Sequence, residues 1–234
     1  ALLGPRVINR TGARFPLLVK ILDCAQWLSL QVHPDDALAL QLEGPGHFGK
    51  TEAWHVLEAA PGATLIAGMR PRTTAAALAD AIRTGTVLDW AQYQDVRAGD
   101  TVFMPARTIH ALGPGLLIFE VQQTSNLTYR VFDWNRPATP NRMLHIDKSL
   151  AVADAGAAAP VRPAPPLDDG EGAILVTCPH FTLELIAGRA RSVARDTAGQ
   201  TFHTLTMIEG AAEIVVAEET LRLERFDSAL VPAA

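Results

Sequence analysis

The stretch Gly99–His110, GDTVFMPARTIH, decides the fold, because it places a glycine turn, a strand, a proline turn and a histidine in close succession. Its apolar runs and turn residues predict two short strands, Asp100–Met104 and Thr108–Leu112. Units of the same kind follow at Leu116–Gln122 and Thr128–Asp133. Many short strands separated by glycine and proline predict a mainly β fold, as an antiparallel barrel or jelly roll.

Strands and turns continue to alternate between this stretch and the N-terminus. Further strands are predicted at Phe15–Ile21, Leu28–His33, Glu52–Glu58 and Thr64–Gly68. Helical patterns occur at Asp35–Glu43, Ala75–Arg83 and Val87–Tyr93. We therefore expect residues 1–150 to form one β domain with a small helical insert at about residues 71–95.

The C-terminal part of the chain changes in composition before strand patterns return. Residues 151–170 are rich in Ala, Pro and Asp, which predicts a linker. Beyond it, strands are predicted at Ala173–Thr177, Phe181–Ile186, His203–Glu209, Ala212–Ala217 and Ser228–Val231. Residues 171–234 are therefore expected to form a second, smaller β lobe. The chain begins with alanine and its last residues read as a strand, so we expect a truncated lobe and a longer parent protein.

Composition and charge exclude several classes of function. The 234 residues carry a net charge of −5, which gives no basic surface for nucleic acid. The apolar runs are too short to span a bilayer, and no secretory signal pattern is present. Two cysteines are too few for a disulfide framework. We expect a cytoplasmic protein that binds neither nucleic acid nor membranes, and the sequence leaves its oligomeric state open.

Four polar residues fall on predicted strands where they could share a metal ion. Gln31 and His33 are two positions apart on one strand, so they face the same side. Glu52 opens the next strand and His110 lies in another. Two imidazoles, one carboxylate and one amide oxygen suit Zn²⁺, although Mn²⁺, Fe²⁺ or Ni²⁺ would accept the same donors. From spacing alone, ordinary polar residues at a sheet margin remain the alternative.

The same residues lie in segments that together resemble type I phosphomannose isomerases of the shorter bacterial form. These segments are LSLQVHPDD (Leu28–Asp36), GKTEAWHVL (Gly49–Leu57), PARTIHALG (Pro105–Gly113) and TYRVFDWNR (Thr128–Arg136). The opening stretch also resembles the second cupin motif, G-x5-P-x-G-x2-H. The resemblance is dense from Phe15 to Asp147 and loose beyond.

The resemblance implies a cupin-type β-barrel and an aldose–ketose isomerase that interconverts mannose 6-phosphate and fructose 6-phosphate with one Zn²⁺ per chain. It places the metal ligands at Gln31, His33, Glu52 and His110. It places an active-site arginine at Arg130 and a lysine at Lys50. An arginine keeps its charge and would stabilise an enediolate. Lys50 could bind the phosphate, hold a sugar hydroxyl or act as the base.

One residue departs from the family pattern, and one further motif points to a different class of function. Arg107 occupies the place of the motif glycine, where a positive φ is expected. Gly44–Thr51 matches the phosphate-loop pattern G-x4-G-K-[ST], but a helical pattern precedes it and a strand pattern follows, which is the wrong context. Two other functions stay open from the sequence: another metal-dependent cupin enzyme such as a dioxygenase, and a non-catalytic sugar-binding module.

Overall fold

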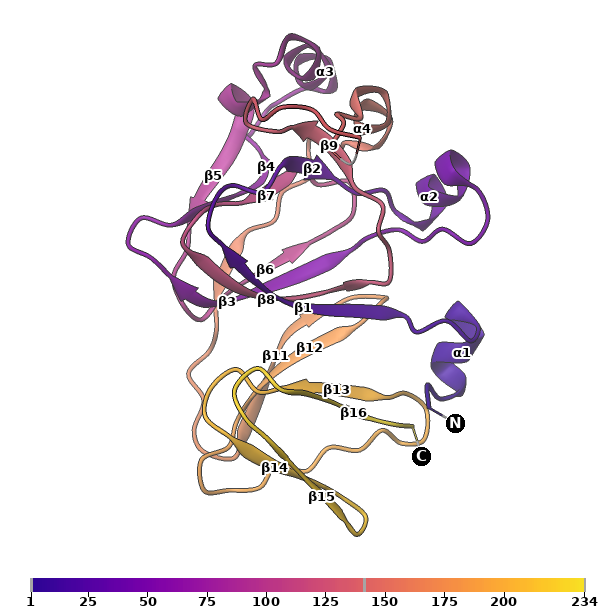
Figure 1. The fold of residues 1–234 in the computed structure, drawn as a ribbon, viewed down its shortest axis with the longest axis vertical. Coiled ribbons are helices and arrows are strands. Elements are labelled where there is room, and N and C mark those ends of the chain that lie inside the picture. The colour runs from indigo at the N-terminus through magenta and orange to yellow at the C-terminus, as the bar shows by residue number, and fades with distance from the viewer. Residues whose placement is uncertain (1, 141, 234) are drawn as a thin grey trace. The chain divides into compact units, whose positions relative to one another are not determined.

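The computed structural model describes residues 2–140 and 142–233, which are divided between two compact units (Figure 1). One unit comprises residues 17–164 and 178–183, and it contains every predicted site residue. The other comprises residues 2–16, 165–177 and 184–233. Strands dominate both units, so the prediction of a mainly β fold is confirmed.

Two five-stranded antiparallel sheets build the unit that contains the predicted site. The first has the order β1 (Leu17–Cys24), β8 (Leu116–Gln123), β3 (Glu52–Ala59), β6 (Asp100–Met104) and β10 (Val161–Pro163). The second has the order β5 (Ala91–Asp95), β4 (Thr64–Met69), β7 (His110–Leu112), β2 (Leu30–Val32) and β9 (Tyr129–Phe132). Each strand predicted between residues 15 and 133 is present, with its ends shifted by a few residues.

The space between the two sheets is filled by one apolar cluster. Trp54 and Val56 of β3 pack there with Leu65 of β4 and Leu112 of β7. Side chains alternate along a strand, so Glu52 points from β3 to the same side as Trp54. The first sheet therefore presents a carboxylate to the interior between the sheets.

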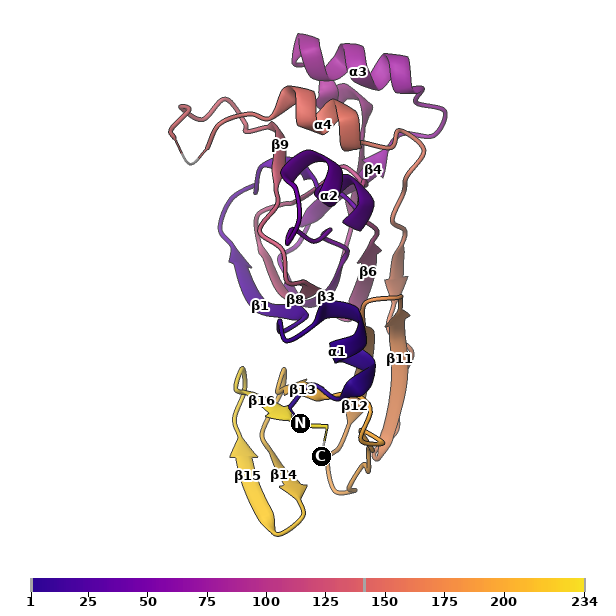
Figure 2. The same cartoon turned by 90° about the vertical axis from the view of Figure 1, so that its right-hand side faces the viewer.

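The opposite face of the second sheet is covered by helices (Figure 2). Leu30 and Val32 of β2 are fully buried in a second cluster, together with Leu78 of α3 (Ala75–Thr84) and Val152 of α4 (Ile146–Val152). Gln31 lies between these two apolar residues on a three-residue strand. Alternation therefore turns its side chain away from the helices and into the space between the sheets.

Helix boundaries follow the predicted capping residues. Thr74 Oγ1 accepts a hydrogen bond from Ala77 N at 3.1 Å, and Gly85 ends α3 with φ 77°. Asp35 Oδ1 accepts one from Leu38 N at 2.9 Å at the start of α2 (Asp36–Glu43). Both helix predictions are confirmed.

The helix predicted at 87–93 is wrong beyond its first residues. Residues Val87–Trp90 form a single 3₁₀ turn, η1, and the chain then enters β5. Tyr93 and Gln94 pair with Ile66 and Leu65 of β4. A free sheet edge thus outweighs the local helical pattern, because pairing satisfies a row of backbone groups.

The second unit is built from shorter elements. The strands outside the two five-stranded sheets, most of whose residues belong to this unit, pair as β11 (Glu171–Thr177) with β12 (Thr182–Ala187), β13 (His203–Thr206) with β16 (Ser228–Val231), and β14 (Ala212–Val216) with β15 (Glu219–Leu223). The sequence did not predict β15, nor the helix α1 (Pro5–Thr11) near the N-terminus. Among the helices described here, none is long and apolar enough to cross a membrane.

Candidate metal centre

Three of the four predicted metal ligands converge at one buried point between the sheets. His33 directly follows β2, Glu52 begins β3 and His110 begins β7. One ligand atom from each lies within 4.8 Å of the others, and the three residues are 0–1% exposed. Glu52 Oε1 is 3.2 Å from His110 Nε2, and Glu52 Oε2 is 3.6 Å from His33 Nε2.

The second nitrogen of each imidazole fixes which lone pair faces the centre. His33 Nδ1 lies 2.8 Å from the carbonyl oxygen of Leu127, and His110 Nδ1 lies 2.8 Å from that of Thr108. A carbonyl oxygen only accepts, so each Nδ1 must donate, and Nε2 is left with its lone pair. Metal-binding histidines are oriented in this way in proteins.

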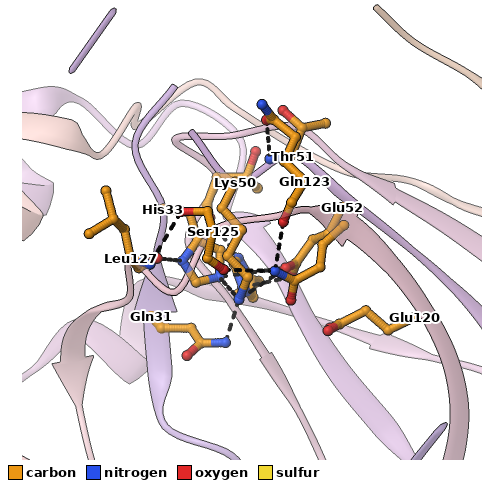
Figure 3. Close-up of polar contacts among 12 residues, drawn as sticks. Gln31, His33, Lys50, Thr51, Glu52, Glu120, Gln123, Ser125 and Leu127 are labelled. Atoms are coloured by element: carbon orange, nitrogen blue, oxygen red, sulfur yellow. Dashed lines mark hydrogen bonds and ion pairs between the residues drawn. The ribbon is translucent and has the colours of Figure 1, made fainter. Parts of the chain in front are cut away.

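Gln31 brings the fourth predicted donor to the same place (Figure 3). In the ladder it is paired with His110 of β7 on one side and with Arg130 of β9 on the other. Its Nε2 lies 3.3 Å from His110 Nε2. A half-turn of the amide exchanges its nitrogen and oxygen, which would direct Oε1 at a cation in the centre.

Lys50 is the positive group next to these donors. Its ammonium is 3.0 Å from His33 Nε2 and 3.3 Å from Glu52 Oε2, and the residue is 7% exposed. Burial raises the pKa of Glu52, but Lys50 and the two histidines outweigh that effect and hold it well below its usual range. Burial and Lys50 lower the pKa of His33 well below its usual range. The centre therefore presents an ionised carboxylate and a neutral imidazole.

The donor set fits a divalent cation. Both carboxylate oxygens of Glu52 are buried, and within the described residues neither has a hydrogen-bond partner. Lys50 supplies one positive charge 3.3 Å from Oε2, and the unmade hydrogen bonds of a buried, ionised carboxylate remain costly unless a further group such as a metal ion occupies them. Two imidazole lone pairs, a carboxylate and an amide are nitrogen and oxygen ligands that transition-metal ions accept. The structure thus supports a metal cofactor at the predicted position.

The phosphate-loop pattern at Gly44–Thr51 has a different use. Helix α2 comes before it, and its backbone donors are already bonded: Gly49 N to Asp36 Oδ1 at 2.7 Å, Lys50 N to Pro34 O at 2.9 Å, and Thr51 N to Gln123 Oε1 at 2.9 Å. A nucleotide loop needs such donors for phosphate. The segment instead holds Lys50 and Glu52 in place (Figure 3).

Comparison with known proteins agrees with this geometry. Residues 1–53 match the model of the catalytic domain of type I phosphomannose isomerase. The mannose-6-phosphate isomerase of Streptococcus mutans is 38% identical over 232 residues, covering 96% of this chain and 70% of that protein. ManA, a mannose-6-phosphate isomerase of Bacillus subtilis, is 32% identical over 228 residues, covering 94% and 70%.

The chain belongs to the mannose-6-phosphate isomerase family. The family resemblance seen in the sequence is therefore confirmed. A crystal structure of the Bacillus subtilis mannose 6-phosphate isomerase aligns with a TM-score of 0.73 and 28% identity, covering 95% of this chain and 71% of that one. A zinc-bound mannose 6-phosphate isomerase aligns with a TM-score of 0.70 at 18% identity, which shows the shared fold.

Arg130 lies beside the metal centre of this family member rather than within it. Its backbone pairs with Gln31, so both side chains leave the sheet on the same face. Its Nη1 donates to the carbonyl oxygen of Met143 at 3.0 Å. Its Nε is buried and has no hydrogen-bond partner among the described residues. Burial lowers the pKa of Arg130, although a guanidinium stays charged at any working pH.

The sequence did not predict a second polar group between the sheets. Glu120 of β8 is 4% exposed and lies across from Lys20 of β1 and Trp54 of β3. Its Oε1 accepts from Lys20 Nζ at 2.5 Å, and its Oε2 accepts from Trp54 Nε1 at 3.0 Å. The Trp54 ring meets His110 edge-on at 5.3 Å between centroids. The one signal was a glutamate within the apolar run Leu116–Val121.

Arg107 adopts the positive φ expected of the motif glycine, with φ 74°. Its N–H donates to the carbonyl oxygen of His33 at 2.7 Å, and its Nε donates to that of Val152 at 3.1 Å. The turn therefore ties a ligand strand to the end of α4.

We expect Arg107→Gly to be about 1 kcal/mol more stable than Arg107→Ala, because both lose the side-chain bond but only alanine keeps the left-handed strain. Urea unfolding monitored by tryptophan fluorescence measures the difference. Equal stability of the two variants would contradict a strained Arg107.

Proposed function

We propose that this chain interconverts mannose 6-phosphate and fructose 6-phosphate, with one zinc ion held by Gln31, His33, Glu52 and His110. The observation that carries the proposal is the convergence of two Nε2 lone pairs on a buried carboxylate, whose oxygens lack a hydrogen-bond partner among the described residues, in a member of this family. Support for zinc comes from the donor set and from the zinc-bound relative that shares the fold.

The reaction moves a proton between neighbouring carbons of the open-chain sugar through an enediol. When bound, the metal supplies a Lewis acid that polarises the sugar carbonyl. Glu52 supplies the negative charge that retains the cation, and the Nδ1 bonds of His33 and His110 keep their Nε2 lone pairs aimed at it. The chain thereby holds the ligands in place before substrate arrives.

Lys50 and Arg130 are proposed to act on the substrate. The Lys50 ammonium lies 3.3 Å from Glu52 Oε2, which supports a proposed role as donor to a sugar oxygen bound at the centre. Arg130 is proposed to hold its positive charge near the enediolate as that charge develops. Lys50 contacts Glu52 and His33, and Arg130 leaves its sheet on the same face as Gln31.

The two other functions considered from the sequence lack comparable support. The named relatives are mannose-6-phosphate isomerases, and none of those described here is a dioxygenase or a sugar-binding protein without activity.

We expect chelation to abolish isomerase activity and added Zn²⁺ to restore it, because the carbonyl is not polarised without the metal. An enzyme-coupled assay starting from mannose 6-phosphate measures turnover before chelation, after it and after reconstitution, with metal content determined at each step. Full turnover by metal-free protein would reject the proposed role of the metal, and no turnover by zinc-loaded protein would reject the isomerase proposal.

A further inference from the structure

A cluster of charged side chains lies just after β9, outside the metal centre. Asp133 is 6% exposed and accepts hydrogen bonds from two arginines. Its Oδ1 accepts from Arg136 Nη2 at 2.6 Å and from Arg142 Nη2 at 2.7 Å, and its Oδ2 accepts from Arg142 Nε at 2.9 Å. Arg136 Nε also donates to the Asp133 carbonyl oxygen at 3.1 Å. One carboxylate thus orients two guanidinium groups.

The charges of this cluster do not balance. Arg136 and Arg142 share the single negative charge of Asp133, and Arg130 lies close enough to interact electrostatically with all three residues. Three guanidinium groups against one carboxylate leave two positive charges, and the side chains of Arg136 and Arg142 are 24% and 40% exposed. Like charges held together at partial burial are unfavourable unless an anion joins them. A phosphate monoester carries about −1.5 to −2 at neutral pH, so it would offset the positive charge that Asp133 leaves uncompensated on Arg136 and Arg142.

One pocket is lined both by residues of this cluster and by Gln31. Arg136 and Arg142 line a pocket of about 220 Å³ that is also lined by Ser29, Trp27 and Gln31. Gln31 is the proposed metal ligand that contacts His110. The pocket therefore has a cationic wall and, elsewhere on its surface, a residue of the proposed reaction centre.

We propose that Arg136 and Arg142 bind the phosphate group of the sugar substrate, and that Asp133 is the residue that positions them. The inference rests on the proposed function and identifies the part of the site that recognises the end of the substrate remote from the reacting carbons. The bonds to Asp133 use Nε and Nη2 of each guanidinium, and Nη1 takes no part in them. Oriented guanidinium groups favour phosphate over a neutral hydroxyl, because charge-assisted bonds are the stronger ones.

The test compares two unreactive sugar alcohols, glucitol 6-phosphate and glucitol, by calorimetric titration into the metal-loaded protein. We expect the unchanged chain to prefer the phosphorylated compound. Arg136→Gln and Arg142→Gln should each lower the affinity for glucitol 6-phosphate by about 10- to 100-fold and leave the affinity for glucitol unchanged. Arg142→Lys, which keeps a charge for Asp133, should be weakened less. Arg83→Gln, an exposed arginine in the last turn of α3, is the control for loss of one positive charge.

Metal content and thermal unfolding of each variant show whether it is folded. If a glutamine variant does not fold, Arg142→Lys is compared with the unchanged chain instead. Glutamine variants that bind glucitol 6-phosphate as tightly as Arg83→Gln does would overturn the phosphate assignment. An unchanged chain that binds glucitol 6-phosphate no better than glucitol would also overturn it. Turnover of mannose 6-phosphate by the unchanged chain is measured separately. If the unchanged chain turns over mannose 6-phosphate but the arginine variants bind glucitol 6-phosphate normally, only the phosphate site is rejected. If the chain prefers the phosphorylated compound through these arginines but has no turnover, the phosphate site is supported and the isomerase proposal is rejected.

Discussion

Replacing His110 with alanine is expected to lower bound metal from near one equivalent per chain to background, and isomerase activity with it. The imidazole supplies one of two Nε2 lone pairs, and its Nδ1 bond to Thr108 fixes that lone pair on the centre. Loss of an outer-shell partner alone costs about 10- to 100-fold in metal affinity. Loss of a direct ligand should exceed the upper end of that range.

The matched control for this variant is His55→Ala. His55 is also buried and also on a strand of this unit, but it leaves β3 on the face opposite to Glu52 and bonds to Thr101 Oγ1 at 2.9 Å. It should keep the metal while losing some stability. Metal content by elemental analysis and turnover by the coupled assay check both variants. Stoichiometric metal in His110→Ala would show that the proposed centre is not where the ion binds.

Replacing Arg130 with alanine is expected to leave the metal in place and to lower kcat by about 10²- to 10³-fold, the range typical of losing one group that stabilises developing charge. The Arg130 backbone pairs with Gln31 in the ladder, and Arg130 does not belong to the converging ligand set. An interaction made mainly in the transition state affects kcat more than KM.

Arg130→Lys provides the conservative comparison, because it keeps a positive charge while losing the planar group that donates to Met143. We expect it to recover part of the lost kcat. Steady-state kinetics with metal content measured on the same samples makes the check. An unchanged kcat in Arg130→Ala would remove Arg130 from the proposed reaction.

Much of this fold is predictable because local and global preferences agree. The strands of both sheets are short apolar or alternating runs separated by glycine and proline, and the caps Asp35 and Thr74 set where two helices begin. The segments that carry Gln31, His33, Glu52 and His110 are recognisable as motifs. The convergence of their side chains follows only when the strands pair.

What escaped prediction depends on contacts between distant parts of the chain. Helix α4 is one short segment held by packing against β9 and α3, and a helix of that length has little stability of its own. Asp133 and Arg136 pair within one turn, but Arg142 joins them only through the course of the loop. Glu120 meets Lys20 a hundred residues away through the register of two strands.

The placement of Gln31 between Leu30 and Val32 makes metal binding a check on correct folding. A slip of β2 by one residue would present an aliphatic side chain to the ion and push an amide into the apolar layer under the helices. Both errors arise from the same displacement, and both are costly. At the proposed centre, a misregistered chain would therefore bind the ion poorly, so metal binding would favour the native strand alignment.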